Sequence, residues 1–521
     1  MVELSSYQSS YNSIESNKSA HEMMQTITSP TETRRLQHQA PESTITVNEA
    51  VELIGIGKFQ QKVLFAAGTC FMADSMEIML LSFLTTVLRA EWGWSDADAN
   101  ENDNYNGTGN EAANITASMF AGALLGTTVF GRLGDRIGRK PVLFCAAFMI
   151  SFFGLATALC NTFTSLLIVR FMVGFGVGGL TVPFDILAEF LPTENRGTYL
   201  LLIEYYWTFG SMIVPIIAYL TIAIGHSWRL FVVVCAIPCV ISLIAGIQVP
   251  ESPRWLILKG RNDEALAILK NAAITNGVNP DDIFPPGCVL QSEEEESCDF
   301  SELFSPKWRK ITINLWVVWA GFAFCYYGTI MIITNVFGSE EQNDDDNNND
   351  GEVSFDYLAI FISSSAELVG TMVVIGLVDR IGRIITQAFA YLIGGLSLFL
   401  LCMLSINQAG RPLLVSLAFI VRVCEMAGTC VTWISTAEIL STEIRSTGHS
   451  AANAVARIGG FCSPYIVAGN MSLGKIGIIM LIIHLVTAFS VTKLPETKGL
   501  ELGKATVCRA NSDYSTELVI A

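Results

Sequence analysis

The chain has 521 residues, of which 51% are hydrophobic and only 15% are charged, and its mean hydropathy is +0.46. This composition is too apolar for a soluble protein of ordinary make-up, so soluble enzymes are excluded and no nucleic-acid partner is expected. The 48 acidic and 31 basic residues give a net charge of −17, and the two signs are segregated along the chain.

The N-terminal segment is polar. Residues 1–57 are rich in Ser, Thr, Gln and Glu, which predicts a disordered cytoplasmic tail without a cleavable signal peptide. Within it, Thr46 and Glu49 have the spacing of a capping box, in which each side chain bonds the other residue's backbone. We therefore expect a short helix, Val47–Ile54, that lies along the inner membrane face.

Apolar runs of helical length follow this tail. A bilayer core about 30 Å thick needs roughly 20 apolar residues per helix. By this measure the sequence predicts twelve spans, at residues 63–87, 116–130, 142–159, 164–187, 200–222, 230–249, 311–336, 357–378, 385–406, 413–434, 450–468 and 475–491. The fold class predicted is therefore an all-α membrane protein with twelve transmembrane helices.

The loops between the spans predict the orientation. Basic residues gather after the second, sixth and eighth spans, and the positive-inside rule places these loops and both termini in the cytoplasm. The opposite loops, 96–114 and 340–356, are acidic and rich in Asn, as solvated outer segments are. Glycosylation sequons at Asn106, Asn114 and Asn470 then lie outside, so we expect a glycoprotein.

One loop sequence occurs twice. Residues 131–140 read GRLGDRIGRK and residues 376–383 read GLVDRIGR, each directly after an apolar run. Two further pairs repeat in the same order: AE at 188–189 before Arg196 with AE at 437–438 before Arg445, and PES at 250–252 with PET at 495–497. The repeats predict two pseudo-symmetric six-helix bundles with substrate bound between them near the midplane.

The predicted bundles cover residues 58–250 and 311–494. A charged cytoplasmic linker, 251–310, joins them and contains a short amphipathic helix at 261–270. Residues 495–521 form a cytoplasmic C-terminal tail.

Charged side chains within the spans are candidates for a binding site, because each costs at least roughly 2.5 kcal/mol at the bilayer centre. Asp74 and Glu77 are three residues apart and share a helix face, which suits a site for a proton or an organic cation. Arg457 has no local partner and could bind a carboxylate substrate. The other candidates are Arg170, Glu204, Trp207 and Glu367.

Several intramembrane residues also have a structural interpretation. Arg422 and Glu425, three residues apart, are expected to neutralise one another, and His484 is expected to serve in packing. An aromatic stripe recurs at helical spacing in the seventh span and consists of Trp316, Trp319, Phe322 and Tyr326. These rings either pack against other helices or form a stacking wall for a flat substrate.

The repeated loop resembles the motif G-x-x-x-D-R-x-G-R-[KR] of the major facilitator superfamily, with a full match at 131–140 and a degenerate one at 376–383. PESPRW at 250–255 and PETKG at 495–499 resemble the sugar-porter signatures. The chain is more similar to the group related to synaptic vesicle proteins and plant organic-ion transporters, through GKFQ at 57–60, MADSME at 72–77, AEFLP at 188–192 and YYG at 326–328. The aromatic stripe stands where hexose carriers place glutamines, which argues against sugar transport.

The resemblance has two implications for residue roles. It implies that Arg170 takes part in proton coupling, the alternative being a structural salt bridge to Glu204 or Asp74. It also implies a cytoplasmic gate that holds the outward-open state, formed by Asp135, Arg136, Arg139, Glu189, Arg196, Glu251, Asp379, Arg380, Glu438, Arg445 and Glu496.

We interpret the chain as a monomeric secondary transporter of a small organic ion that works by alternating access, with H⁺ as the expected coupling ion and no cofactor. The sequence contains no Walker motif, so direct use of ATP is not expected. The alternatives are a non-transporting receptor or vesicle-organising protein of the same fold, and a sugar porter. The orientation fits the plasma membrane and an intracellular vesicle equally.

Overall fold

The computed structural model describes residues 44–92, 110–192, 196–291, 300–340, 353–469 and 471–498. The residues before 44 and after 498 lie outside this range, as do the sequons at Asn106 and Asn470. The third sequon residue, Asn114, lies in the first turn of helix α5, where Ile115 and Thr116 are buried.

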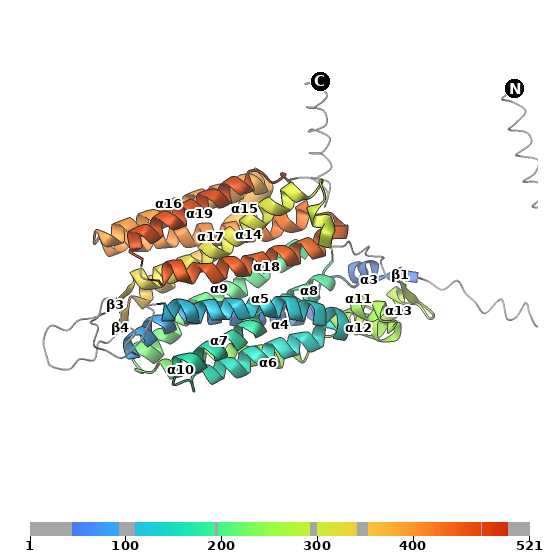
Figure 1. Ribbon diagram of the computed structural model, residues 1–521. Helices are drawn as coiled ribbons and strands as arrows, with labels where there is room; N and C mark the ends of the chain where they lie inside the picture. Colours follow the sequence, from blue (N-terminus) through green and yellow to red (C-terminus); the bar gives the residue numbers. More distant parts are fainter. Residues whose placement is uncertain are drawn as a thin grey trace, which may run out of the picture.

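Long helices in the described residues form two bundles that lie side by side (Figure 1). The first bundle contains α4 (Lys58–Glu91), α5 (Glu111–Ile137), α6 (Arg139–Thr157), α7 (Phe163–Val177) continued by α8 (Thr181–Glu189), α9 (Arg196–Ala218) with a π-helical turn (Tyr219–Ala223), and α10 (Trp228–Gly246). The second contains α14 (Arg309–Val336), α15 (Tyr357–Ile381), α16 (Arg383–Ile406), α17 (Arg411–Ile439), α18 (Thr442–Val467) and α19 (Leu473–Val491).

Eleven helical segments of the described chain are long and apolar enough to cross a membrane. The one predicted span that is not among these eleven, residues 450–468, lies in α18, a more polar helix of 26 residues that carries Arg457. It lies at the interface between the bundles, because its Gly460 packs against Phe120 in α5 of the first bundle, while its Gly459 packs against the backbone of Ala320 in α14 of its own bundle. The prediction of an all-α membrane protein with twelve helices in two bundles is confirmed.

The two bundles share one tight turn. Helix α5 ends at Gly138 with φ 109° and ψ 161°, and α15 ends at Gly382 with φ 108° and ψ 162°. Side chains with a Cβ rarely adopt a positive φ, so the turn favours glycine in both copies. The repeated sequence therefore folds into a repeated structure.

Gly382→Ala is expected to lower the free energy of unfolding by about 1–3 kcal/mol, because of the positive φ and because an added Cβ would lie 2.6 Å from Oε2 of Glu496. Gly376→Ala is the matched control from the same motif, since an added Cβ there meets no atom within 4 Å in helix α15. The control is expected to be neutral or slightly stabilising. Unfolding curves of the purified variants in detergent check this, and equal destabilisation by both would contradict it.

The linker and the residues before α4 form a cap at the end of the bundles where Gly138 and Gly382 lie, which we call the linker end (Figure 1). Strand β1 pairs in parallel with β2, with Ile45 opposite Leu290. The cap consists of β1 (Thr44–Thr46), α3 (Val47–Ile54), α11 (Pro253–Leu258), α12 (Asn262–Asn276), α13 (Pro280–Ile283), β2 (Val289–Gln291) and a 3₁₀ turn (Phe300–Phe304). At the opposite end, which we call the far end, β3 (Gly338–Glu340) pairs antiparallel with β4 (Val353–Phe355).

Helix α3 has the predicted bounds and capping box. The backbone N–H of Thr46 donates to Glu49 at 3.0 Å, and that of Glu49 donates to Thr46 Oγ1 at 3.2 Å. Helix α3 packs on the linker helices and buries its apolar side there: Val47, Ala50, Val51 and Ile54. Its position along the inner membrane face stays a prediction. Beyond the predicted helix, residues 44–46 form strand β1, so the ordered part of the chain begins before α3.

Candidate functional site

A cavity lies between the two bundles, and both bundles contribute to its wall. It encloses about 670 Å³ of space, part of it open to solvent, which is within the range of small-molecule sites. Its charged and polar lining residues are Asp74 in α4, Glu204 in α9, Thr429 in α17, and Asn453 and Arg457 in α18. Aromatic side chains form much of the remaining wall, namely Phe71, Trp207, Phe322, Tyr326, Tyr327 and Trp433.

Asp74 and Arg457 bring opposite charges to this cavity. Asp74 is 5% exposed and its Oδ1 has no hydrogen-bond partner, while Arg457 is 8% exposed and its Nε and Nη1 have none. The two side chains form no ion pair with each other in the described structure. Because buried polar atoms are normally hydrogen-bonded, these three atoms are available to a bound molecule.

Glu77, which was predicted to share a face with Asp74, forms a buried ion pair instead of lining the cavity. Its Oε2 lies 2.6 Å from Nη1 of Arg170, and the two side chains are 1% and 0% exposed. The Nη2 of Arg170 also donates to Oγ1 of Thr157 at 2.5 Å. A structural salt bridge was the alternative expected for Arg170, with Glu204 or Asp74 as its partner. The salt bridge is present, but its partner is Glu77.

Glu367 forms a second buried network that joins the two bundles. Its Oε1 lies 2.8 Å from Nη2 of Arg422, and its Oε2 accepts a hydrogen bond from Ser211 in α9 at 2.9 Å. Tyr326 also donates to Glu367, and its hydroxyl accepts a hydrogen bond from Nε1 of Trp207 at 2.6 Å. Because Trp207 and Tyr326 line the cavity, Glu367 fixes part of the cavity wall from behind.

The expected neutralisation of Arg422 by Glu425 is wrong, because Glu425 pairs with His484 in α19. Oε1 of Glu425 lies 2.6 Å from Nε2 of His484. Nδ1 of His484 lies 2.7 Å from the carbonyl oxygen of Met480 and 3.3 Å from Sγ of Cys325. His484 thus forms polar contacts as well as packing. One donor atom from each of Cys325, Glu425 and His484 lies within 4.8 Å of the others, in a buried cluster of residue types that bind metals.

The predicted aromatic stripe divides into two parts. Phe322 and Tyr326 line the cavity, as a stacking wall requires. Trp319 is fully buried behind the lining, where its Nε1 donates to Thr436 at 2.9 Å and its ring packs edge-on against Trp433 at 5.0 Å. Trp316 also packs, edge-on against Phe304 at 5.5 Å, so Trp316 and Trp319 serve in packing whereas Phe322 and Tyr326 face the cavity.

An aromatic contact joins the bundles between the cavity and the linker end. The ring of Phe184 in α8 lies 5.6 Å from that of Trp433 in α17, and Phe71 of the cavity wall lies 6.1 Å from Phe184. Helices α8 and α17 end at the linker end, at Glu189 and Ile439, so this contact lies on that side of the cavity.

At the far end the bundles are joined by hydrogen bonds. Nη2 of Arg89 at the end of α4 donates to the carbonyl oxygen of Ala468 after α18, at 3.3 Å. Oγ1 of Thr334 in α14 donates to Oγ of Ser82 in α4 at 3.0 Å. These contacts hold the bundles together at the end opposite the linker.

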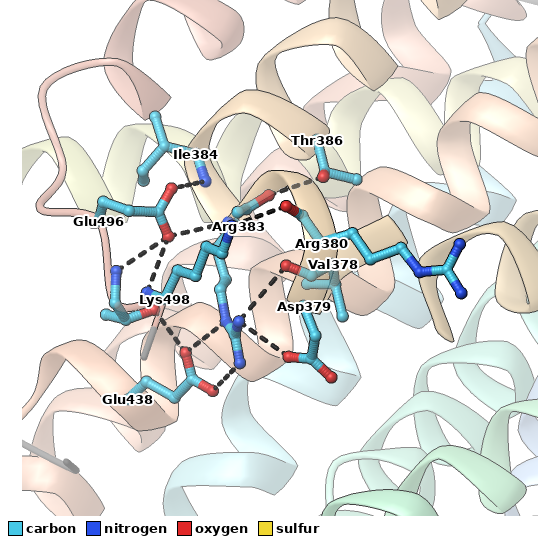
Figure 2. Close-up of polar contacts among 11 residues, drawn as sticks. Val378, Asp379, Arg380, Arg383, Ile384, Thr386, Glu438, Glu496 and Lys498 are labelled. Carbon is cyan, nitrogen blue, oxygen red and sulfur yellow. Dashed lines mark hydrogen bonds and ion pairs between the residues drawn. The ribbon is translucent and has the colours of Figure 1, made fainter. Parts of the chain in front are cut away.

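Arg383 is the centre of a charged network at the linker end of the second bundle (Figure 2). Its guanidinium donates two hydrogen bonds of 2.9 Å to the carboxylate of Glu438 and lies 2.9 Å from Asp379. The carboxylate of Glu496 accepts hydrogen bonds from the backbone N–H groups of Arg383 at 2.9 Å and Ile384 at 3.1 Å. Glu496 thereby caps the start of α16 beside the Gly382 turn.

The environment of Glu496 makes this turn sensitive to acid. Partial burial acts to raise the pKa of its carboxyl, but backbone N–H groups of Arg383, Ile384, Lys498 and Thr497 outweigh burial and hold the pKa below its usual value. A carboxyl with a depressed pKa stabilises the fold above its unfolded-state pKa, and this contribution is lost as the pH falls through the folded-state pKa. The capped turn is therefore most stable at neutral pH.

The first bundle repeats this arrangement. The carboxylate of Glu251 accepts a hydrogen bond from the backbone N–H of Arg139 at 2.8 Å, and the side chain of Arg139 lies 3.1 Å from Asp135. Ser252 donates a hydrogen bond to Glu189. Asp135 and Glu251 thus both contact Arg139, as Asp379 and Glu496 contact Arg383, while Glu189 is bonded to the residue that follows Glu251.

The contacts described for the predicted gate residues all lie within one bundle. Arg136 and Arg380 are exposed, and Nε of Arg445 donates to the carbonyl oxygen of Leu440 at 3.3 Å. The side chain of Arg196, at the start of α9, lies outside the described part of the structure. A role of these residues in holding an outward-open state stays a prediction.

The predicted binding residues fall into two groups. Those that line the cavity are Asp74, Glu204, Trp207, Tyr326 and Arg457, and those that lie behind its wall are Glu77, Arg170, Trp319 and Glu367. Lining residues that the sequence did not single out include Phe71, Thr429 and Trp433. Phe71 lies three residues before Asp74 on the same helix face, which is a usable signal, whereas the position of Trp433 follows only from the packing of α17. The binding roles stay predictions.

Comparison with known proteins places the chain among transporters. Residues 81–507 match the family described as sugar (and other) transporter. The chain is 30% identical to the Synaptic vesicle 2-related protein of Xenopus laevis, over 82% of this chain and 76% of the relative. It is also 30% identical to Organic cation/carnitine transporter 7 of Arabidopsis thaliana, over 88% of this chain and 95% of the relative.

Solved structures support the same fold. The inward open conformation of the xylose transporter XylE from E. coli gives a TM-score of 0.67 at 18% identity, over 86% of this chain and 99% of that chain. The proton:xylose symporter XylE bound to 6-bromo-6-deoxy-D-glucose gives a TM-score of 0.62 at 20% identity, over 86% and 99% of the two chains. At this level of identity the likeness shows the fold alone.

Proposed function

Because the chain belongs to the sugar (and other) transporter family of the major facilitator superfamily, we propose that it moves a small organic ion across a membrane by secondary active transport. The observation that carries the proposal is the cavity between the bundles, where Asp74 and Arg457 hold polar atoms without partners. Substrate would bind there, and the two bundles would rock around it so that the cavity opens to one side at a time.

The contacts between the bundles support a state in which the cavity faces the linker end. Hydrogen bonds from Arg89 and Thr334 join the bundles at the far end, whereas the described contacts of the gate residues stay within one bundle. The positive-inside rule places the linker and both termini in the cytoplasm, so this would be the inward-facing state. The Phe184–Trp433 contact would narrow the route from the cavity to that side.

The coupling ion in this proposal is H⁺, with the Glu77–Arg170 pair as its site. The pair is buried in the first bundle, and a proton on Glu77 would remove the charge that compensates Arg170. The resulting rearrangement would reach the cavity through α4, because Glu77 lies three residues after Asp74 on the same helix. Substrate binding and protonation would then be linked through one turn of helix.

The choice of an organic ion rests on the charges of the cavity. Its described lining contains the charged residues Asp74, Glu204 and Arg457 and no Gln, whereas a site for a neutral sugar needs uncharged hydrogen-bonding groups. The similarity to an organic cation/carnitine transporter supports the same substrate class. The similarity to synaptic vesicle 2-related proteins supports an intracellular vesicle as the membrane.

Uptake into liposomes that contain the purified full-length chain tests this proposal. Radiolabelled carnitine, nicotinate and xylose are offered in parallel under an imposed pH gradient, with protein-free liposomes as the control. We expect at least one of the two organic ions to accumulate above its external concentration, and a protonophore to abolish the accumulation. Accumulation of xylose alone would favour the sugar porter, and no accumulation of any probe by folded protein would favour the non-transporting alternative.

A further inference from the structure

The charges that line the cavity point to a substrate class narrower than an organic ion. We infer that the cavity binds a zwitterion with a flat apolar body, whose carboxylate pairs with Arg457 and whose cationic amine pairs with Asp74. The inference rests on the proposed function, because it takes this cavity as the substrate site.

Arg457 supplies the site for the carboxylate. The side chain is 8% exposed and lines the cavity, and its Nε and Nη1 have no hydrogen-bond partner in the described structure. A carboxylate can accept two parallel hydrogen bonds from a guanidinium edge, which is the strongest pairing available to these donors. A substrate with only a cationic group would leave both donors buried and unpaired, which is costly.

Asp74 and Glu204 supply the site for the cationic amine. Asp74 is 5% exposed with an unpartnered Oδ1, and the carboxylate of Glu204 has no described ion pair or hydrogen bond. Two carboxyl groups and one guanidinium line the cavity, so a substrate with only a carboxylate would add a third acidic group opposite a single base. A molecule that carries both charges satisfies Arg457 and Asp74 together.

The rest of the wall fits an apolar body. Trp207, Phe322, Tyr326, Tyr327 and Trp433 present aromatic rings to the cavity, and such rings stack on flat molecules and attract cationic amines through their faces. Two of these rings, Trp207 and Tyr326, are held by the hydrogen bonds that lead to Glu367. The wall is therefore preorganised on the side where the two bundles meet.

The placement of the two charges also gives the zwitterion a mechanical role. Asp74 lies on α4 of the first bundle and Arg457 on α18 of the second. A single molecule that pairs with both residues links the bundles across the cavity, whereas a molecule with one charge binds strongly to only one bundle. Both bundles would thus contact the substrate before they rock.

Calorimetric titration of the purified full-length chain with two matched ligand series tests the inference. The first series is para-(aminomethyl)benzoate, para-toluate and para-methylbenzylamine, and the second is phenylalanine, hydrocinnamate and phenethylamine. Each contains a zwitterion, an anion and a cation of nearly the same size. We expect at least one zwitterion to bind with a Kd about tenfold or more below those of its matched anion and cation, since each lost charge pair is worth about that factor.

Two variants separate the charge pairs from a structural effect. In Arg457→Gln the zwitterion is expected to bind no more tightly than the matched cation, and the Kd of the cation is expected to change by less than about threefold. In Asp74→Asn the zwitterion is expected to bind no more tightly than the matched anion. Arg261→Gln, at the exposed N-cap of α12 in the cap, is the control and should leave all affinities unchanged.

The outcomes distinguish this inference from the proposed function. An anion or cation that binds as tightly as its zwitterion overturns the inference, as does an Arg457→Gln variant that weakens the cation as much as the zwitterion. Absence of binding by both zwitterions also overturns it, while proton-driven uptake of another organic ion would leave the transporter proposal standing. Selective zwitterion binding without uptake in liposomes would keep the inference and reject transport.

Discussion

Glu77→Gln is expected to lower the free energy of unfolding by about 3–5 kcal/mol, because removing one partner of a buried pair leaves the other charge uncompensated. The substitution preserves side-chain size but removes the charge that lies 2.6 Å from Nη1 of Arg170, a side chain that is fully buried. The hydroxyl of Thr157 still accepts a hydrogen bond from Arg170, but a neutral group does not replace a carboxylate. Thermal and chemical unfolding in detergent measure the loss.

The double variant Glu77→Gln/Arg170→Gln is the informative comparison. It removes both charges, so its free energy of unfolding is expected to exceed that of Glu77→Gln alone, in which the charge of Arg170 has no partner. Glu264→Gln, in the first turn of α12, breaks the exposed pair with Arg261 and serves as the control, with an unchanged unfolding curve. If Glu77→Gln unfolds as the control does, the buried pair does not stabilise the fold. Under the proposed function, the double variant also loses proton-driven accumulation.

Glu367→Gln is expected to destabilise the protein by a similar amount, about 3–5 kcal/mol, and to weaken binding in the cavity. Its carboxylate compensates Arg422, whose side chain is 2% exposed, and it accepts hydrogen bonds from Ser211 and Tyr326. A glutamine keeps an acceptor oxygen but not the charge. Because Tyr326 orients Trp207 through a 2.6 Å hydrogen bond, the cavity wall is expected to loosen as well.

Ser211→Ala is the matched control for Glu367→Gln. It removes one hydrogen bond of 2.9 Å between the bundles and leaves the ion pair with Arg422 intact. The expected loss is about 0.5–1.5 kcal/mol, the usual net value of a hydrogen bond. The free energies of unfolding of both variants are compared under identical conditions. If both variants lose the same free energy, the charge on Glu367 does not stabilise the protein beyond its hydrogen bonds.

Features that depend on nearby residues were predictable from the sequence. The capping box of α3 has the expected bonds between Thr46 and Glu49, because both partners lie within one turn. The duplicated loop predicted the two bundles, and the matching angles of Gly138 and Gly382 confirm that the repeat extends to the backbone. Local spacing and repetition therefore predicted most of the architecture.

Partner choice among buried charges was not predictable in the same way. Spacing along one helix suggested that Arg422 pairs with Glu425, but each pairs with a residue of another helix, Glu367 in α15 and His484 in α19. Glu77 likewise pairs with Arg170 in α7. A sequence shows which charges share a helix, whereas the rotation and depth of neighbouring helices decide which side chains meet across the bundle. Arg457 was identifiable as unpaired because it has no partner at helical spacing, whereas the unpartnered Oδ1 of Asp74 was found only in the structure.

The parallel pairing of β1 with β2 ties the beginning of the described chain to its middle. Residues 44–46 and 289–291 form this pairing, and α3 buries its apolar side on the linker. A fluorescent or affinity tag fused ahead of residue 44 leaves this arrangement intact. A truncation that begins at residue 58 instead removes β1 and α3. Apolar side chains of α12 that α3 covers then become exposed to solvent, and the protein is expected to aggregate even though its helices insert correctly.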